Sequence, residues 1–337
     1  MKRKYWIIFS FLGALVLFLL FSYWYMIMCE GSWNGRTLDS GLKDELKDIK
    51  NNLVSDVSYL SESLGPRNPT HFENLVAAEE WISKYWESQG YEVNRQTFWA
   101  EGKEYANLEI EIPGHSLPSE IVIVSAQYDT HPDSPGANNN AGGIAVLLRL
   151  GELLKSQQLD RTVRLVAFTT QEPPYSLTEF MGSRVYAKSC YEKGDDIRMI
   201  LCMDAIGVYK HEAGTQKLPF PFSLFYPDKG DFLAFISDLD SRSCLVDVTR
   251  GFKKGTSFHI EAGCAPRWVK GVTWSDHESF WRYGYKGIQI TDTGAFRSSA
   301  HVTRDDTMEK MDFNALAQIT IGMYASILEV ANLKGTT

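Results

Sequence analysis

The stretch that decides the fold is IVIVSAQYDT, residues 121–130, followed closely by PGANNNAGG, residues 135–143. Residues 121–126 form an apolar run, which is typical of a strand buried on both faces of a parallel sheet. The polar residues that come directly after it therefore stand at the carboxyl edge of a sheet. Open α/β sheets gather their functional sites at this edge.

Working outward from this stretch, strand patterns alternate with helix patterns over most of the chain. Strands are predicted at residues 91–99, 105–112, 121–126, 162–169, 199–203 and 286–291. Helices are predicted at residues 74–89, 141–154, 181–191, 232–239 and 314–332. This alternation predicts an α/β fold of three layers, in which helices cover both faces of a mainly parallel central sheet. We expect this domain to occupy residues 65–337.

The N-terminal segment has the composition of a membrane anchor. Residues 5–29 carry no charge, and three basic residues, Lys2 to Lys4, precede them. About 20 apolar residues suffice to cross a bilayer, and aromatic residues at both ends are typical of its two interfaces. A cleaved signal peptide would need small residues before the cleavage site, but residues 25–28 are bulky. We predict a single-pass anchor at residues 1–29, with a cytoplasmic N-terminus and a periplasmic or extracellular domain.

Residues 30–64 are predicted to connect the anchor to the domain. Apolar residues recur every three or four positions from Leu42 to Leu60, which indicates a helix with one apolar face. We expect a linker followed by an amphipathic stalk helix that packs onto the domain or the membrane-proximal stalk. A dimerising coiled coil is the alternative, although the segment is short for one.

Charge and cysteine content exclude other classes. The net charge of −8 argues against nucleic acid as a partner, because phosphate binding needs a basic surface. None of the five cysteines forms a C-x-x-C pair, so no zinc knuckle or thioredoxin-like motif is present. A disulfide among Cys190, Cys244 and Cys264 is left open.

Four segments rich in polar residues follow predicted strands. They are residues 127–143, residues 168–184 with Gln171-Glu172-Pro173-Pro174, residues 203–207 with Asp204-Ala205-Ile206-Gly207, and residues 275–307 with Ser275-Asp276-His277 and His301-Val302. In order, spacing and flanking residues, these segments resemble the co-catalytic zinc aminopeptidase family. That family includes bacterial leucyl aminopeptidases, glutamate carboxypeptidase, the glutaminyl cyclases and the transferrin receptor. The resemblance runs from about residue 65 to the C-terminus and implies the zinc aminopeptidase fold.

The resemblance also implies which residues occupy the family's metal positions. The family places a His-x-Asp pair after the first of these strands; its Asp matches Asp129, but Gln127 stands at the His position. The bridging Asp position holds Asn139. The Glu-Glu pair, general base and then ligand, corresponds to Gln171 and Glu172.

Two further positions complete the comparison. The next acidic ligand of the family matches Asp204, so Glu172 and Asp204 are the retained ligands. The last ligand, a histidine, falls on Val302 in a gapless register, and His301 takes that place only if the register slips by one. We expect His277 to line the pocket and Asp129 to lie behind it as a hydrogen-bonding carboxylate.

These departures predict a site without a competent catalytic residue. Amide oxygens are weak zinc ligands, and Gln171 cannot take a proton from water. We therefore expect no cofactor and a function by binding, with peptides or an extracytoplasmic protein as partner. The alternative is an atypical aminopeptidase or related hydrolase with one zinc ion; a purely structural role is the third possibility.

A hypothesis about the amides follows from the cost of burying like charges. Two buried carboxylates without a metal repel each other and lose their hydration. We expect Gln127, Asn139 and Gln171 to donate hydrogen bonds to Glu172 and Asp204, since acid-to-amide replacements supply donors of the same shape.

Overall fold

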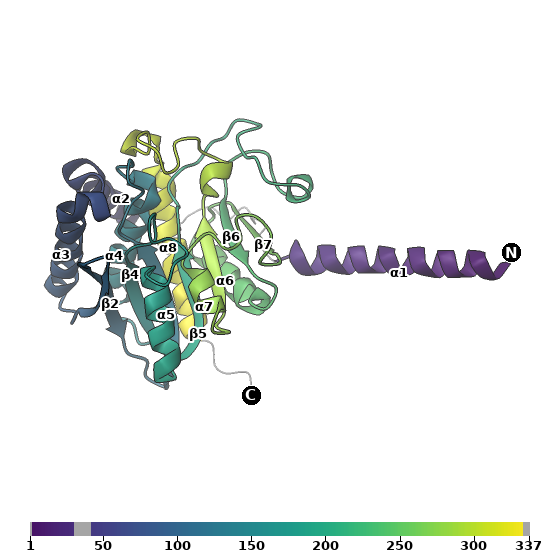
Figure 1. The fold of residues 1–337 in the computed structure, drawn as a ribbon, viewed down its shortest axis with the longest axis horizontal. Coiled ribbons are helices and arrows are strands. Elements are labelled where there is room, and N and C mark those ends of the chain that lie inside the picture. Colours follow the sequence, from purple (N-terminus) through teal and green to yellow (C-terminus); the bar gives the residue numbers. More distant parts are fainter. Residues whose placement is uncertain (1, 30–41, 333–337) are drawn as a thin grey trace.

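The computed structural model describes residues 2–29 and 42–332, and its centre is one mixed sheet (Figure 1). The eight strands of this sheet lie in the order β1-β2-β4-β3-β5-β8-β6-β7. They are β1 (Asn94–Ala100), β2 (Lys103–Ile112), β3 (Leu117–Gln127), β4 (Arg161–Phe168), β5 (Asp196–Met203), β6 (Leu233–Ser237), β7 (Ile260–Cys264) and β8 (Gly287–Thr291). The central strands β4, β3, β5 and β8 run parallel, whereas β1, β2 and β6 each have an antiparallel neighbour.

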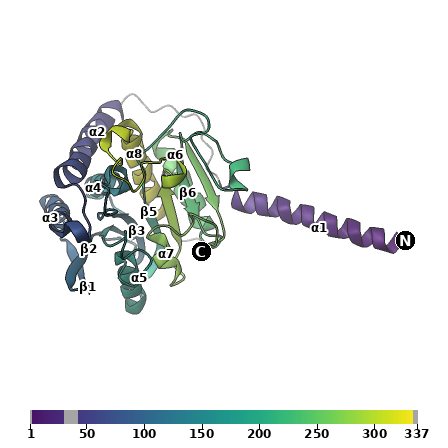
Figure 2. The same cartoon turned by 45° about the horizontal axis from the view of Figure 1, so that its top comes forward.

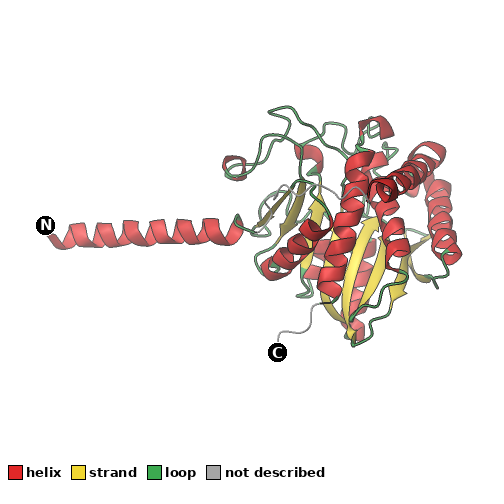
Figure 3. Ribbon diagram, turned by 180° about the vertical axis from the view of Figure 1, so that it is seen from behind, coloured by secondary structure: helices red, strands yellow, loops and turns green. Residues whose placement is uncertain are grey.

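Helices cover both faces of the sheet, so the predicted three-layer α/β fold is confirmed. The helices are α1 (Lys2–Met26), α2 (Leu42–Ser58), α3 (Phe72–Ser88), α4 (Gly143–Leu154), α5 (Gly182–Lys193), α6 (Arg242–Gly255), α7 (His277–Trp281) and α8 (Phe313–Ala331). Helices α5 and α7 lie on the face turned forward in Figure 1, and α6 and α8 on the face turned forward in Figure 3.

The central strand β3 shows how its sequence produces these layers. Successive side chains of a strand point to opposite faces. Val122 and Val124 are buried in the larger core with α4 and α8, whereas Ile121 and Ile123 are buried in the smaller core with α5 and α7. Because both faces are covered there, residues 121–124 of this strand are apolar without interruption, and its polar end at Gln127 lies at the carboxyl edge.

One predicted element is wrong. Residues 232–239 do not form a helix; they contain strand β6, and α6 and β7 follow without having been predicted. A short apolar run does not distinguish a buried strand from a buried helix, because both hide every side chain. The run of Leu233 to Ser237 is five residues long, which suits a strand better than a helix.

Helix α2 packs onto the domain, as predicted. Its apolar face places Leu53 and Val57 in the larger core, and Leu60 follows them in the next turn; all three are fully buried. The boundaries at residues 29 and 64 stay a prediction, and residues 30–41 of the predicted linker lie outside the described residues.

Helix α1 stands apart from these layers. It projects away from the domain (Figure 2), and its domain end lies beside β7 (Figure 1). Its window Phe9–Met26 is long and apolar enough to cross a membrane and is not buried in the protein. Helix α8 passes the same length and composition test, but most of it is buried, because it is the central helix of the larger core.

The burial of α2 can be tested at Leu53. We expect Leu53→Ala to lower the free energy of unfolding by about 2–5 kcal/mol, because it leaves a cavity in the core. Urea unfolding of the full chain in detergent measures the change. Asn51→Ala, at an exposed position of the same helix, is the control and should change stability by under about 0.5 kcal/mol. Equal stability of the two variants would contradict the packing.

Candidate binding site at the carboxyl edge of the sheet

A pocket of about 340 Å³ opens where the parallel strands end. Part of its polar lining comes from three loops after β3, β4 and β5 and from the loop before α8: Asn139, Gln171, Glu172, Asp204 and His301. Other polar residues, among them Glu261, Lys270 and Gln289, line it from further along the sheet. Most of the remaining wall is apolar and includes Leu177, Met181, Leu218, Phe222, Val272, Trp274 and Phe296. The strand ends thus bring together the predicted residues of four segments that are far apart in the sequence.

Gln127, the last residue of β3, is the centre of the polar network. Its side-chain nitrogen donates to Asn139 Oδ1 at 3.0 Å and to Asp204 Oδ1 at 3.2 Å. Its oxygen accepts from Asn140 Nδ2 at 2.7 Å. This side chain is fully buried and cannot contact water. Its polar atoms are therefore satisfied by these three hydrogen bonds within the protein.

Asn139 extends the network to the second carboxylate. Its Nδ2 donates to Glu172 Oε1 at 2.8 Å. The predicted donation of amide hydrogen bonds to Glu172 and Asp204 is therefore confirmed for Asn139 and Gln127. For Gln171 the prediction is wrong: among the described residues its side chain donates no hydrogen bond to Glu172 or Asp204, its buried Oε1 has no partner, and it lines the pocket.

Two carboxylates bind the loop of residues 138–140, named here the asparagine loop. The sequence did not predict this role. Asp306 accepts from the backbone N–H groups of Asn138 and Asn139 at 2.9 and 3.0 Å. Asp292 accepts from Asn138 Nδ2 at 2.8 Å and from the Val208 backbone N–H at 2.9 Å. An acidic residue in a loop gives no local sign of such long-range bonds.

Burial and mutual repulsion keep the acids of the pocket less acidic than usual. Burial, with the Asp129 and Asp204 carboxylates nearby, raises the pKa of Glu172 to about 8. Burial also raises the pKa of Asp129 to about 6, although this residue accepts a hydrogen bond from the Glu172 backbone N–H at 2.9 Å. The pKa of Asp204 rises through burial as well, while His301 and Gln127 oppose the rise. The pocket therefore has a cluster of carboxyl groups with raised pKa values. A bound cation would lower these pKa values and favour the ionised carboxylates.

His301 and its neighbour Val302 both line the pocket. Val302 has a φ of +55°, in the left-handed region that a β-branched residue rarely adopts. The Nδ1 atom of His301 is buried and has no partner among the described residues. The loop thus turns the imidazole inward at the position one residue before the gapless match.

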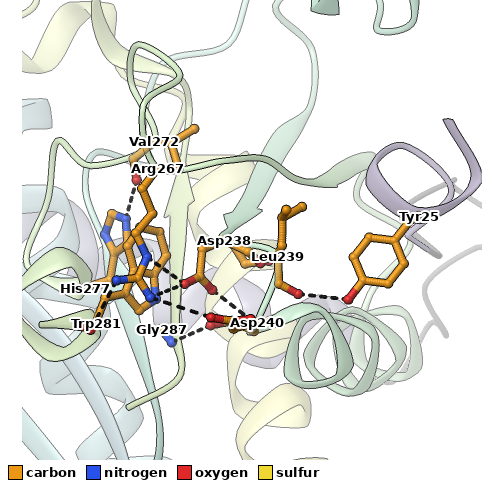
Figure 4. Close-up of polar contacts among 11 residues, drawn as sticks. Tyr25, Asp238, Leu239, Asp240, Arg267, Val272, His277, Trp281 and Gly287 are labelled. Carbon is orange, nitrogen blue, oxygen red and sulfur yellow. Dashed lines mark hydrogen bonds and ion pairs between the residues drawn. The ribbon is translucent and has the colours of Figure 1, made fainter. Parts of the chain in front are cut away.

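His277 lies behind the pocket. It begins α7, is fully buried, and its Nε2 lies 2.7 Å from the Val272 carbonyl oxygen, which lies next to the pocket wall (Figure 4). The ring also packs edge-on against Trp281, with 4.5 Å between centroids. Burial lowers the pKa of His277 to about 4, so the imidazole is neutral at physiological pH.

Comparison with known proteins identifies relatives of this chain. Residues 107–327 match peptidase family M28. The uncharacterized protein YfbL of Escherichia coli K12 is 29% identical over 280 residues, which cover 80% of this chain and 85% of that protein.

Solved structures share the fold at low identity. BSAP, a zinc aminopeptidase from Bacillus subtilis, aligns with a TM-score of 0.68 and 15% identity, covering 86% of this chain and 96% of that chain. The glutaminyl cyclase of Fimbriiglobus ruber aligns with a TM-score of 0.61 and 19% identity, covering 83% and 94%.

These comparisons correct one prediction. The expectation of no cofactor is wrong, because the aminopeptidases of this family, such as BSAP, are zinc enzymes. The donor set of this chain nevertheless does not fit the two-zinc site that the resemblance implies. Within residues 2–29 and 42–332, no group of three or more His, Cys, Asp or Glu side chains is gathered so that it could hold a metal ion.

The role of Asn139 can be tested by restoring the acid of the family. At alkaline pH and with a chelator, Asn139→Asp should lower the free energy of unfolding by about 1–3 kcal/mol, because a donor is lost and a third carboxylate is added. Excess zinc should then stabilise this variant more than the unchanged chain. The control is Asn52→Asp on the exposed side of α2. Equal stability of the two variants in chelator would refute the network.

The burial of His277 predicts a pH dependence of stability. Its folded pKa lies below the ordinary value of 6.5, so below pH 6.5 the unfolded chain takes up a proton that the folded chain refuses. The stability that this residue contributes is therefore lost as the pH falls toward 4, by about 1.4 kcal/mol per pKa unit.

His277→Gln, which keeps a donor for the Val272 carbonyl, should remove this loss. Urea unfolding of both proteins across this pH range measures the difference between them, in which the opposite contributions of the buried carboxyl groups cancel. Parallel curves for the two proteins would show that His277 is not held neutral.

Proposed function

Because the chain belongs to peptidase family M28, we propose that it is a membrane-anchored, zinc aminopeptidase-like protein that binds the amino-terminal end of peptides without hydrolysing them. The residue that carries this proposal is Gln171. The resemblance implies that Gln171 occupies the position of the family's general base. Its side chain lines the pocket directly beside Glu172.

An amide at this position removes a proton acceptor. A carboxylate takes a proton from water and returns it to the leaving amine, and such acid–base catalysis contributes about 10²–10⁴ in rate. A neutral primary amide has no comparable basicity at any physiological pH. The proposal therefore does not depend on how much zinc the protein carries.

The lining of the pocket supports an amino-terminal ligand. Glu172 and Asp204 offer carboxyl groups at the floor, which suit an ammonium group. Approach of this cation lowers the pKa of Glu172, so binding releases a proton near neutral pH. The apolar wall, with Met181 and Phe296, suits an apolar first side chain.

Membrane anchoring is supported by α1. Its apolar window is unburied in the protein and follows the basic residues Lys2 to Lys4. Basic residues remain on the cytoplasmic side, so the domain lies outside, in the periplasm or the extracellular space. A cleaved signal sequence would fit the same helix position, and gel mobility of the mature protein distinguishes the two.

The binding function is tested with a peptide that begins with leucine and with its N-acetylated twin. The full chain in detergent should bind the free peptide at least about tenfold more tightly, since acetylation removes the cation that the carboxyl floor recognises. Glu172→Gln should weaken this preference, whereas Asp240→Asn, at an exposed position, should leave it unchanged.

Hydrolysis is measured on the same free peptide, with a chelator and with added zinc. No leucine should be released in either condition. Zinc-dependent release above the protein-free background would support the single-metal hydrolase with Glu172, Asp204 and His301. Equal binding of the acetylated twin would refute recognition of the amino group, and absence of binding by either peptide would leave a structural role.

A further inference from the structure

We propose that two loops beside the pocket insert apolar side chains into the outer leaflet of the membrane that holds α1, so that the pocket opens at the lipid surface. The loops are residues 219–226 and 265–271, named here the membrane-facing loops. This inference rests on the proposed anchoring through α1.

The membrane-facing loops expose large apolar side chains. Trp268 is 85% exposed and Phe220 80%, and Leu224 and Phe225 are exposed by 68% and 47%. Single exposed apolar residues are ordinary on protein surfaces, but a cluster of large ones marks an interaction surface. Tryptophan and phenylalanine are also residues that membrane interfaces favour.

The cluster is continuous with the end of α1. The rings of Phe225 and Tyr23 lie 5.4 Å apart between centroids. Met26, the last residue of α1, packs against the same small buried cluster as Phe222 and Val269, one from each membrane-facing loop. In Figures 1, 2 and 3 the short helix η4 (Phe222–Leu224) lies beside the domain end of α1.

Polar contacts fix the orientation of the domain at this end of the helix. Tyr25 donates its hydroxyl to the Leu239 carbonyl at 3.0 Å (Figure 4). Arg242 donates to the Tyr25 carbonyl at 2.8 Å and to the Met28 carbonyl at 3.1 Å. The helix therefore leaves the domain from a docked end, which sets the side of the domain that faces the bilayer.

The loop that carries Trp268 is held by an ion pair near the same place. Arg267 donates to the buried Asp238 carboxylate at 2.6 Å, and Asp238 in turn accepts from the Ser241 backbone N–H at 2.9 Å (Figure 4). The pair joins the loop to the segment that receives Tyr25. Trp268 is thus presented from a fixed position.

The length of α1 places these residues at the depth of the interface. The 18 residues of Phe9–Met26 rise about 27 Å at 1.5 Å each, close to the hydrocarbon thickness of a bilayer. If this window spans the hydrocarbon, Met26 lies at its outer boundary. Side chains that contact Tyr23 and Met26 lie at the same level.

The same loops line the pocket. Pro219, Phe222 and Tyr226 come from the first loop, and Val269 and Lys270 from the second. If the loops insert, the mouth of the pocket is at the membrane surface. The ligand class of the proposed binding function is then a peptide amino terminus presented at the lipid surface, such as that of a membrane-attached protein.

The experiment is bromolipid quenching of tryptophan fluorescence on the full chain in phosphatidylcholine vesicles. The chain has nine tryptophans, of which Trp6 and Trp24 belong to the α1 sequence. We expect quenching from these two and from Trp268. Trp268→Phe should remove roughly a third of the quenched signal, in proportion to three tryptophans at membrane depth.

Trp99→Phe is the matched control. Trp99 is also exposed, at 66%, but lies in β1 at the opposite edge of the sheet from β7 and α1. Its removal should leave the quenched signal unchanged. Phe220→Asp should reduce the quenching of Trp268, because a charge opposes insertion of the loops.

The outcomes distinguish failure of loop insertion from failure of the proposed anchoring by α1. Quenching that Trp268→Phe does not reduce would overturn the inference while α1 remains inserted. Absence of all quenching would overturn the anchoring, and the inference with it. Concentration-dependent dimers in which Trp268 is shielded from bromolipid would assign the exposed cluster to a second copy of the chain and would also overturn the inference.

Discussion

One buried guanidinium organises the strand ends on which the pocket depends. Arg67 is fully buried and donates to carbonyl oxygens of the chain on three sides, including those of Leu60, Tyr128 and Gly136. Burial lowers its pKa to about 10, which still leaves it charged. A buried charge of this kind is tolerated only when its donors are satisfied. Arg67 therefore links the carbonyl groups of three separate segments. One of these is Gly136, which comes just before the asparagine loop and is fixed in position by this bond.

In the site itself, amide side chains offset the cost of burying several carboxyl groups close together. Acids that are gathered for a metal repel one another without it, and their pKa values rise. Gln127 and Asn139 lessen this cost by donating to Asp204 and Glu172. At the positions where the resemblance implies metal ligands, Gln127 and Asn139 thus act as hydrogen-bond donors. Such a pocket suits a cation, and Gln171 places an amide, which cannot take a proton from water, beside Glu172.

The parts of this site that sequence predicted are those with local patterns. The apolar run of β3 and the polar residues after it identify the strand end, and the order of the segments identifies the fold. The bonds from Asp306 to Asn138 and Asn139 join residues more than 160 positions apart, so no local pattern reports them. His301 lines the pocket next to Val302, whose left-handed backbone is rare for a β-branched residue and cannot be predicted from the sequence.

The proposed position of the pocket at the membrane and the proposed binding without hydrolysis support each other. An enzyme that turns over dissolved peptides benefits from a mouth open to bulk solvent. A binding domain at a lipid surface meets ligands that share its membrane, and tethering of both partners raises their effective concentration far above the bulk value. A modest intrinsic affinity then suffices for occupancy. In this proposal an amide in place of a general base leaves the bound peptide intact, so the loops beside Met26 and the amide of Gln171 would serve one function.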